Sequence, residues 1–208
     1  MYTKIKEDEL SLLIYTNDSL NLKIYDLDST RWEDFELLFG PRGACGGCWC
    51  MSWRLKKSEF ELGKGESNKY SMKDTVYRDK PAGVLAYVDD KPIGWCAVAP
   101  REVYKRLENS KVLKRIDDEP VWSITCLFIE KAFRRKGVST ELIKGAIEYA
   151  KLKGANIVEA YPVFPYDNKM PDAFLWTGIP MAFEKAGFTE AIRRSKRKPI
   201  MRYFTKQE

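Results

Sequence analysis

The 208-residue sequence contains no histidine. Because histidine is the side chain that titrates near neutral pH, its absence excludes serine–histidine and cysteine–histidine hydrolases, histidine-ligated metal enzymes and any histidine acid or base. Acid–base or nucleophilic chemistry in this chain must therefore use Asp, Glu, Cys, Tyr, Ser, Lys or backbone amides.

Long hydrophobic runs are also missing. The longest apolar stretches, such as residues 83–88, fall well short of the roughly 18 residues of a membrane-spanning helix. Near the N-terminus, Glu7, Asp8 and Glu9 stand where the hydrophobic region of a signal peptide would begin. We therefore expect a cytoplasmic protein with no membrane partner.

Cysteine is present, but not in a pattern that indicates a disulfide scaffold. The five cysteines are an odd number in a chain without an export signal, so free thiols are expected. Cys45, Cys48 and Cys50 lie in Pro-Arg-Gly-Ala-Cys-Gly-Gly-Cys-Trp-Cys, residues 41–50, which we call the cysteine loop. A closed zinc site needs a fourth ligand, which only another cysteine or a carboxylate supplies here. We expect no metal and interpret the segment as a glycine-rich loop with small buried thiols; a reactive or redox thiol is the alternative.

Length and composition favour one folded domain. Hydrophobic residues make up 44% and charged residues 32% of the chain, a balance that permits a buried core in a soluble protein. No repeat, low-complexity linker or second-domain boundary is evident. We expect a single domain over residues 1–208, with an N-terminal extension at 1–19 and a core over residues 20–204.

Hydrophobic periodicity predicts alternating strands and helices. The predicted strands cover residues 10–15, 20–25, 84–88, 93–98, 121–129, 157–161, 188–192 and 200–204. Helices are predicted at 30–39, 140–153 and 180–186, one or two solvent-facing helices within 52–77, and a helical or irregular segment at 103–113. The strand at 121–129 is apolar throughout, so it should be central and should join the strand at 157–161 in a parallel βαβ unit.

The most informative segment is Phe133-Arg134-Arg135-Lys136-Gly137-Val138-Ser139-Thr140, residues 133–140, which we call the basic loop. It lies between the central strand and the helix predicted at 140–153. The first N–H groups of a helix have no internal partners, glycine permits close approach, and the helix dipole favours negative charge. Adjacent cationic side chains add to this attraction. The loop predicts a phosphate or pyrophosphate site, with an ordinary capped basic turn as the alternative.

The same residues resemble a family motif. Residues 128–139 are similar to the acetyl-CoA-binding motif of the GNAT family of N-acetyltransferases, which runs Gln or Arg, two residues, Gly, any residue, Gly or Ala. Arg134 takes the first position and Gly137 the first glycine, whereas Ser139 replaces the small third residue. Downstream, Phe183-Glu184-Lys185-Ala186-Gly187-Phe188 resembles the family's aromatic-Glu-Lys-x-Gly-Phe segment. The order of the expected elements also matches the family.

The resemblance implies an α/β (α+β) fold of the GNAT-like acyl-CoA N-acyltransferase type. Such a fold is a mixed, mostly antiparallel sheet with a central parallel βαβ unit and flanking helices. The implied activity is acetyl-CoA-dependent transfer of an acetyl group to a primary amine of a small molecule or peptide, by direct attack in a ternary complex. A homodimer is a further expectation. The implied CoA-binding residues are Leu127, Phe128 and Ile129, whose strand end would pair with pantetheine amides, and Arg134, Arg135, Lys136, Gly137, Val138, Ser139 and Thr140.

The sequence departs from the family at both proton-transfer positions. The glutamate base of some relatives corresponds to Ser123, and the tyrosine acid of the later helix corresponds to Phe183. The remaining candidates for catalysis are Tyr161, Glu159, Ser123 and Cys126. For Tyr161 a core aromatic and for Glu159 a solvent-facing carboxylate stay as alternatives, and Cys126 is a candidate for acylation or for holding a relay water.

Aromatic residues suggest the acceptor side. A proline- and aromatic-rich connection at residues 162–177 is longer than the family's usual one, and long loops of this kind are typically functional. We expect the acceptor pocket to be walled by Trp49, Trp53, Trp122, Tyr166 and Trp176; the alternative is that these residues patch the core. Asp167 and Asp172 are candidates for binding a cationic amine.

The formal charge of +6 includes a basic run from Arg193 to Lys198. Because no aromatic residues alternate with these cations, a solvated loop is favoured over a nucleic-acid patch. The sequence thus predicts an acetyltransferase. The alternatives are a catalytically weak acyl-CoA sensor of the same fold and a nucleic-acid-associated basic protein.

Overall fold

The computed structural model describes residues 12–166, 170–171 and 174–206. The described strands form one eight-stranded sheet in the order β1-β2-β3-β4-β5-β6-β8-β7. Only β5 and β6 run parallel; all other neighbours are antiparallel. The strands are β1 (Leu13–Asn17), β2 (Leu22–Asp26), β3 (Gly83–Val88), β4 (Lys91–Pro100), β5 (Trp122–Ile129), β6 (Ile157–Ala160), β7 (Thr189–Arg193) and β8 (Pro199–Phe204). The mixed, mostly antiparallel sheet predicted from the sequence is confirmed.

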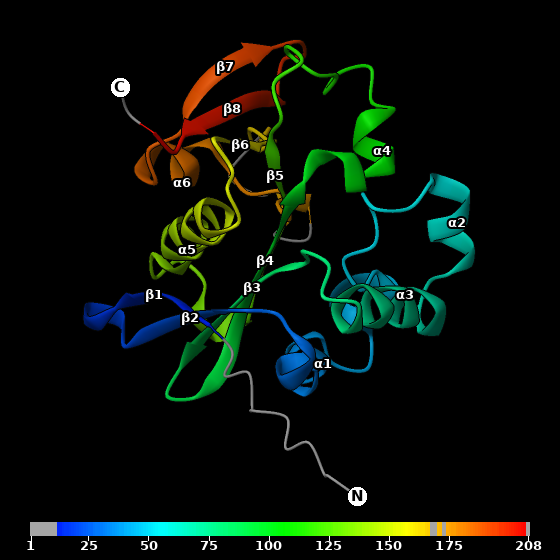
Figure 1. Cartoon of the computed structure of the whole chain (residues 1–208), viewed down its shortest axis with the longest axis vertical. Helices are drawn as coiled ribbons and strands as arrows, with labels where there is room; N and C mark the ends of the chain where they lie inside the picture. The colour runs from blue at the N-terminus through cyan, green and yellow to red at the C-terminus, as the bar shows by residue number, and fades with distance from the viewer. Residues whose placement is uncertain (1–11, 167–169, 172–173, 207–208) are drawn as a thin grey trace, which may run out of the picture.

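Helices cover both faces of the sheet (Figure 1). One face carries α5 and α6, and the opposite face carries α1, α2 and α3. The helices are α1 (Trp32–Phe39), α2 (Lys57–Leu62), α3 (Glu66–Tyr77), α4 (Lys105–Glu108), α5 (Val138–Leu152) and α6 (Pro180–Lys185). Short helical turns lie at Asp18–Leu20, Ser29–Arg31, Arg101–Val103 and Lys131–Phe133. The Gly43–Gly47 segment forms a tight turn in which Ala44, Cys45 and Gly46 have non-helical backbone angles. The sheet therefore has two buried faces, each with its own core.

The predicted elements lie close to their expected positions. The first predicted helix is preceded by a turn in which the Asp28 carboxylate accepts hydrogen bonds from the N–H groups of Thr30 and Arg31 at 2.9 and 3.2 Å. The strand expected at 10–15 is described from Leu13 onward, since residues 10 and 11 lie outside the described range.

The segment predicted as one or two solvent-facing helices contains α2 and α3. Each of these helices buries one side: Phe60 on α2 and Met72 and Val76 on α3 belong to the core beside α1. The many lysines and glutamates of this segment concealed how much apolar surface the two helices cover.

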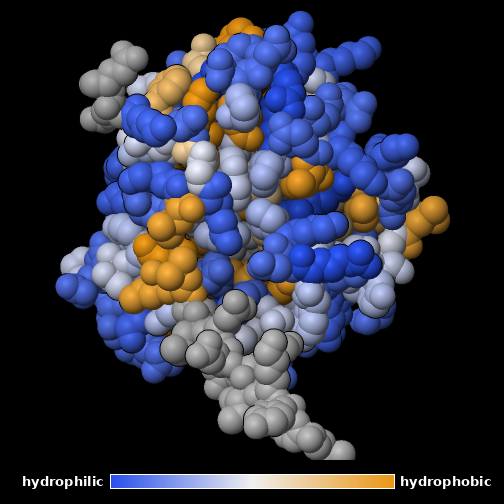
Figure 2. Space-filling model, viewed as in Figure 1, coloured by the Kyte–Doolittle hydropathy of each residue, from blue (hydrophilic) through white to orange (hydrophobic). Residues whose placement is uncertain are grey.

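The surface is mainly polar. On the face shown in Figure 2, hydrophilic residues predominate and hydrophobic residues form separate patches. Among the described residues, no helix combines the length and apolar character needed to cross a membrane.

The parallel pair at the centre of the sheet is short. The pairing between β5 and β6 ends where Ile124 meets Ala160, although β5 continues to Ile129. Directly after Ile124, Thr125 is an extra residue relative to β4 and forms a bulge. The last residues of β5 therefore have no strand neighbour on the side of β6, and the sheet opens next to the basic loop.

Helix α5 packs closely against β2. Its apolar side includes Leu142, Ala146 and Ala150, which are all buried. Gly145 faces β2 at a distance that leaves no room for a side chain, because a Cβ there would lie 2.6 Å from the Cδ1 of Ile24. The glycine thus sets how near α5 comes to the sheet.

We predict that Gly145→Ala lowers the free energy of unfolding by about 1 kcal/mol or more, because the new methyl group overpacks the contact with Ile24. An alanine in an ordinary helix interior would stabilise instead. Denaturant unfolding measures the change. Ile24→Val in the same chain should recover part of the loss by removing Cδ1, and stabilisation by Gly145→Ala alone would contradict the close contact.

Candidate active site

The basic loop ends at the open N-terminus of α5. Gly137 directly precedes the helix and has a φ of 84°, in the left-handed region that favours glycine. No described side chain caps the first turn of α5, and a Cβ on Gly137 would meet no atom within 4 Å. The N–H groups and the positive end of the helix dipole therefore face open space, which suits an anion.

Two arginines of this loop border the same space. The Nε of Arg134 donates a hydrogen bond to the Ile129 carbonyl at 2.8 Å, which joins the loop to the end of β5. Arg135 follows with a positive φ of 60°. Lys136 is exposed, and its Nζ lies 5.6 Å from the centre of the Phe133 ring. The loop thus concentrates positive charge beside an uncapped helix.

A cavity of about 620 Å³ extends from this loop past the end of β5 to the cysteine loop. One wall comes from the last residues of β5 and another from the segment at 175–182. The opposite wall comes from the cysteine loop, α1, α2 and the residues between them, and includes Phe39, Ser52, Trp53, Phe60 and Lys64. No aspartate or glutamate occurs among the described residues that line it. The cavity is therefore apolar and aromatic, and its charged side chains are cations.

The segment at 175–179 fills the opening in the sheet. The Leu127 N–H donates a hydrogen bond to the Trp176 carbonyl at 2.7 Å, and the Val163 N–H donates to the Gly178 carbonyl at 3.0 Å. The segment therefore occupies the position that a strand beside β5 would take. This differs from the expectation that the Leu127 amide is available to pantetheine, because a buried N–H with a good acceptor gains little from a second one.

The structure brings the expected CoA-binding residues together where the C-terminal end of β5 lies near the N-terminus of α5. The residues that line the cavity are Leu127, Phe128, Ile129, Arg134, Arg135 and Ser139. Lys136, Gly137, Val138 and Thr140 lie between or beside them in the basic loop but outside the described lining. Their expected role in CoA binding stays a prediction.

Three of the four catalytic candidates lie elsewhere, in a buried network. The Tyr161 hydroxyl donates to Glu159 at 2.8 Å and lies 2.8 Å from the Ser123 hydroxyl. Arg101 donates to Glu159 at 3.1 Å and to the Tyr161 hydroxyl at 2.8 Å. Arg202 on β8 donates to the second Glu159 oxygen at 2.9 Å. These contacts join β5, β6 and β8 to the turn after β4.

The network is closed to solvent. Glu159 is 1% exposed and Arg101 is not exposed at all. Burial, followed by the negative charge of Glu159, raises the pKa of Tyr161 well above its usual value. None of Ser123, Glu159 and Tyr161 is among the described residues lining the cavity, so their position favours a structural role. Their catalytic role stays a prediction that the cavity does not support.

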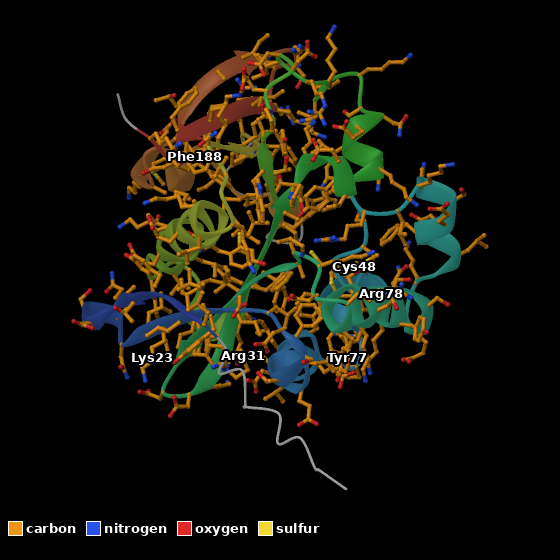
Figure 3. All side chains as sticks on the ribbon, in the orientation of Figure 1. Lys23, Arg31, Cys48, Tyr77, Arg78 and Phe188 are labelled. Carbon is orange, nitrogen blue, oxygen red and sulfur yellow. The ribbon has the colours of Figure 1, made fainter. Side chains whose placement is uncertain are left out.

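Cys126, the fourth candidate, does line the cavity, together with all three thiols of the cysteine loop. Figure 3 labels Cys48, which lies on the side of the sheet that carries α1 and α3. The fifth cysteine, Cys96, is buried on the other face in the core beneath α5. No group of three or more potential metal ligands occurs within the described part of the chain. The sequence placed the three loop thiols together, but gave no signal that they face the same space as Cys126.

The expected acceptor tryptophans divide into two groups. Trp53 and Trp176 line the cavity, with their ring centres 5.9 Å apart. Trp49 is instead buried in the core, stacked on Phe39 at 5.7 Å. A tryptophan in an apolar segment has the same pattern in either position, so the sequence could not separate the two.

The other two expected acceptor residues also lie outside the described lining. Trp122 packs edge-on against Tyr149 of α5, with ring centres 5.8 Å apart. Tyr166 is 53% exposed, and Arg197 lies 5.1 Å from the centre of its ring. The carboxylates of Asp167 and Asp172 lie outside the described residues.

Comparison with known proteins assigns the class. The model of the acetyltransferase (GNAT) family matches residues 49–170, more than half of the chain. The match contains β3 to β6, the basic loop and α5. The chain therefore belongs to the GNAT acetyltransferase family, as the motif resemblance predicted.

Individual relatives are distant. An uncharacterised N-acetyltransferase of Methanocaldococcus jannaschii is 30% identical over 93 residues, which cover 45% of this chain and 37% of that protein. An N-acetyltransferase of the mosquito Aedes aegypti superposes with a TM-score of 0.54 at 11% identity, covering 98% of this chain and 99% of its own. A GNAT-family acetyltransferase of Streptococcus agalactiae gives a TM-score of 0.52 at 13% identity, covering 89% and 96%. The two structures support the fold alone.

We predict that Glu159→Gln lowers the free energy of unfolding by about 3 kcal/mol, because the buried Arg101 and Arg202 each lose one of their two anionic partners. Urea unfolding measures the loss. Glu190→Gln is the matched control, since Glu190 pairs with Arg193 at the surface and should change stability by less than about 0.5 kcal/mol. Equal effects of the two variants would show that the network contributes no more than a surface ion pair.

Proposed function

We propose that this chain is an acetyl-CoA-dependent N-acetyltransferase that moves an acetyl group to a primary amine of a small molecule or peptide. The observation that carries the proposal is the continuous cavity, which joins the open N-terminus of α5 to an aromatic chamber past the end of β5. Family membership gives the class of chemistry. The cavity supplies one end for the acetyl donor and another for the acetyl acceptor.

The donor end suits a diphosphate. Space in front of Gly137, the uncapped first turn of α5 and the neighbouring arginines together favour a doubly charged anion over a neutral ligand. Acetyl-CoA, once bound, supplies an activated acetyl thioester. Because the Leu127 N–H already donates a hydrogen bond to the Trp176 carbonyl, the pantetheine of acetyl-CoA must bind other groups along residues 126–129.

The acceptor end suits an amine with an apolar or aromatic body. Trp53, Trp176 and Phe60 supply its flat apolar walls. Since the described lining holds cations and no carboxylate, the cavity disfavours an ammonium ion and favours the neutral amine. An amine that arrives without its proton is already nucleophilic, so a general base in the protein is not required for the attack.

The nucleic-acid alternative finds no support in the basic run near the C-terminus. Arg193 pairs with Glu190 and lies 4.4 Å from the centre of the Phe164 ring. Arg194 donates hydrogen bonds to the carbonyls of Lys114 and Arg115 at 2.6 and 3.1 Å. These arginines tie together loops of the chain itself.

We predict that acetyl-CoA raises the thermal unfolding temperature of the protein, since a ligand that binds the folded state stabilises it. Gly137→Asp should remove this shift, because its carboxylate repels the diphosphate. Gly137→Asn is the control of equal size and equal tolerance for a positive φ, and it should keep a larger part of the shift. Equal shifts in the two variants would place the diphosphate elsewhere.

We predict release of CoA from acetyl-CoA with a panel of primary amines, strongest for amines with an aromatic body and rising with pH as the neutral fraction of the amine grows. Trp53→Ala should raise the KM for the acceptor about tenfold through lost stacking. Tyr70→Ala, which removes an exposed aromatic side chain on α3, should leave it unchanged. A thermal shift with acetyl-CoA but no CoA release with any amine would favour the sensor alternative.

A further inference from the structure

Four thiols line the cavity. Cys126 belongs to the end of β5, and Cys45, Cys48 and Cys50 face it from the cysteine loop. Family chemistry by direct transfer needs none of them. Their presence on facing walls of one cavity indicates a function of their own.

Cys50 has the most constrained position of the four. It is 6% exposed, and the indole N–H of Trp95 on β4 donates a hydrogen bond to its sulfur at 3.2 Å. Both Cys50 and Trp49 before it have positive φ values, 58° and 42°, which side chains other than glycine rarely adopt. The fold therefore holds this sulfur at the cavity wall at the expense of backbone strain.

A buried cation lies near this sulfur. Arg54 is 6% exposed, and its Nη2 donates to the carbonyls of Pro81 and Ala82 at 2.8 and 3.4 Å. Its Nε is buried without a hydrogen-bond partner, and Arg54 forms no ion pair with a carboxylate of the described residues. A buried guanidinium is costly without a counter-charge. A thiolate at Cys50 supplies that charge.

The surroundings of Cys50 favour its thiolate. A hydrogen bond with Cys126 lowers the pKa of Cys50 most. Burial opposes this effect, and the hydrogen bond from Trp95 and the charge of Arg54 lower the pKa further. The same contact and burial raise the pKa of Cys126, which therefore keeps its proton and acts as the donor. The remaining titratable groups around Cys50 are Cys48, Cys96 and Tyr104, and burial raises the pKa of each.

We propose that Cys50 is an acyl-accepting nucleophile, which takes the acetyl group from the donor and hands it to the acceptor, with Cys126 as the proton carrier beside it. This inference rests on the proposed function, because it requires that the cavity bind acetyl-CoA. It assigns to the cysteine loop a covalent step between the donor and acceptor ends.

The two half-reactions balance. The Cys50 thiolate attacks the thioester carbonyl of the donor, a new carbon–sulfur bond forms, the carbon–sulfur bond to CoA breaks, and the CoA thiolate takes the proton of Cys126. In the second half, the neutral amine attacks the acetyl-Cys50 thioester. The Cys50 thiolate leaves, and the proton released from nitrogen returns to the Cys126 thiolate. No oxidant, metal or additional reactant takes part.

The other thiols are less suited to the step. Cys45 is exposed to solvent, where an acetyl thioester would meet water. Cys48 donates to the Gly43 carbonyl at 3.4 Å, and burial raises its pKa. Cys50 combines a lowered pKa with hydrogen-bond donors that stabilise its anion.

Acyl exchange tests the proposal without knowledge of the acceptor. The full chain is incubated with acetyl-CoA and isotopically labelled CoA, in the absence of any amine, and the label in acetyl-CoA is followed. A covalent intermediate gives exchange, whereas direct transfer in a ternary complex gives none. In parallel, the protein is trapped in acid, and peptide mass spectrometry locates any acetyl group, with lability to hydroxylamine distinguishing a thioester from an amide.

We expect one acetyl group per chain on Cys50 and a loss of exchange of at least about 100-fold in Cys50→Ser, since a hydroxyl is not ionised at neutral pH. Cys96→Ala removes a thiol from the other face of the sheet and should keep both signals. The acetyl-CoA thermal shift of each variant shows that it is folded and binds the donor.

Three outcomes overturn the proposal. A normal thermal shift in the unaltered chain without exchange and without acetyl-Cys50 removes the covalent step and leaves the proposed acetyltransferase intact. An acetyl group on Cys45 or Cys48 that persists in Cys50→Ser shows that another cysteine, not Cys50, accepts the acetyl group. Absence of the thermal shift in the unaltered chain contradicts the proposed function itself, and the covalent step falls with it.

Discussion

The hydrogen bond from the Leu127 N–H to the Trp176 carbonyl joins the two segments around which the site is built. Beyond Ile124, β5 has no strand on the side of β6, and buried backbone groups at such a position need partners. A segment almost fifty residues further along the chain supplies one. Because that segment is not a continuous strand, a cavity stays open beside it, with the N-terminus of α5 at one end and the cysteine loop at the other.

The polar side chains at the two ends of β5 lie in different environments. Near its start, Ser123 belongs to a network in which Arg101 and Arg202 share Glu159, and each arginine has a second carboxylate partner, Glu108 or Asp117. Little chemistry is available to charges so fully paired. Near its end, Cys126 faces a space whose described lining contains cations and no carboxylate. The strand thus separates a structural cluster from a reactive one, although both consist of side chains that could take part in catalysis.

The sequence predicted most of the fold because its signals are local. The apolar stretch of β5, the amphipathic pattern of α5 and the glycine before it each follow from residues close in the chain, and so did the motif resemblance that led to the family. The site was predicted less fully, because its walls depend on which face of the sheet a residue joins. Trp49 and Trp53 differ by four positions, yet one fills the core and the other lines the cavity. Glu159 gave no sign that two arginines distant in sequence would surround it.

The connection between β6 and α6 has two structural roles. It accepts a hydrogen bond from β5 where β5 has no neighbouring strand, and it places Trp176 in the lining of the cavity. A loop that only shaped the acceptor chamber would tolerate insertions and new side chains freely. This one is anchored to the strand that borders the donor, so a change that reshapes the chamber also shifts the backbone beside the thioester. During evolution, the choice of amine and the handling of the acyl group would have to change together.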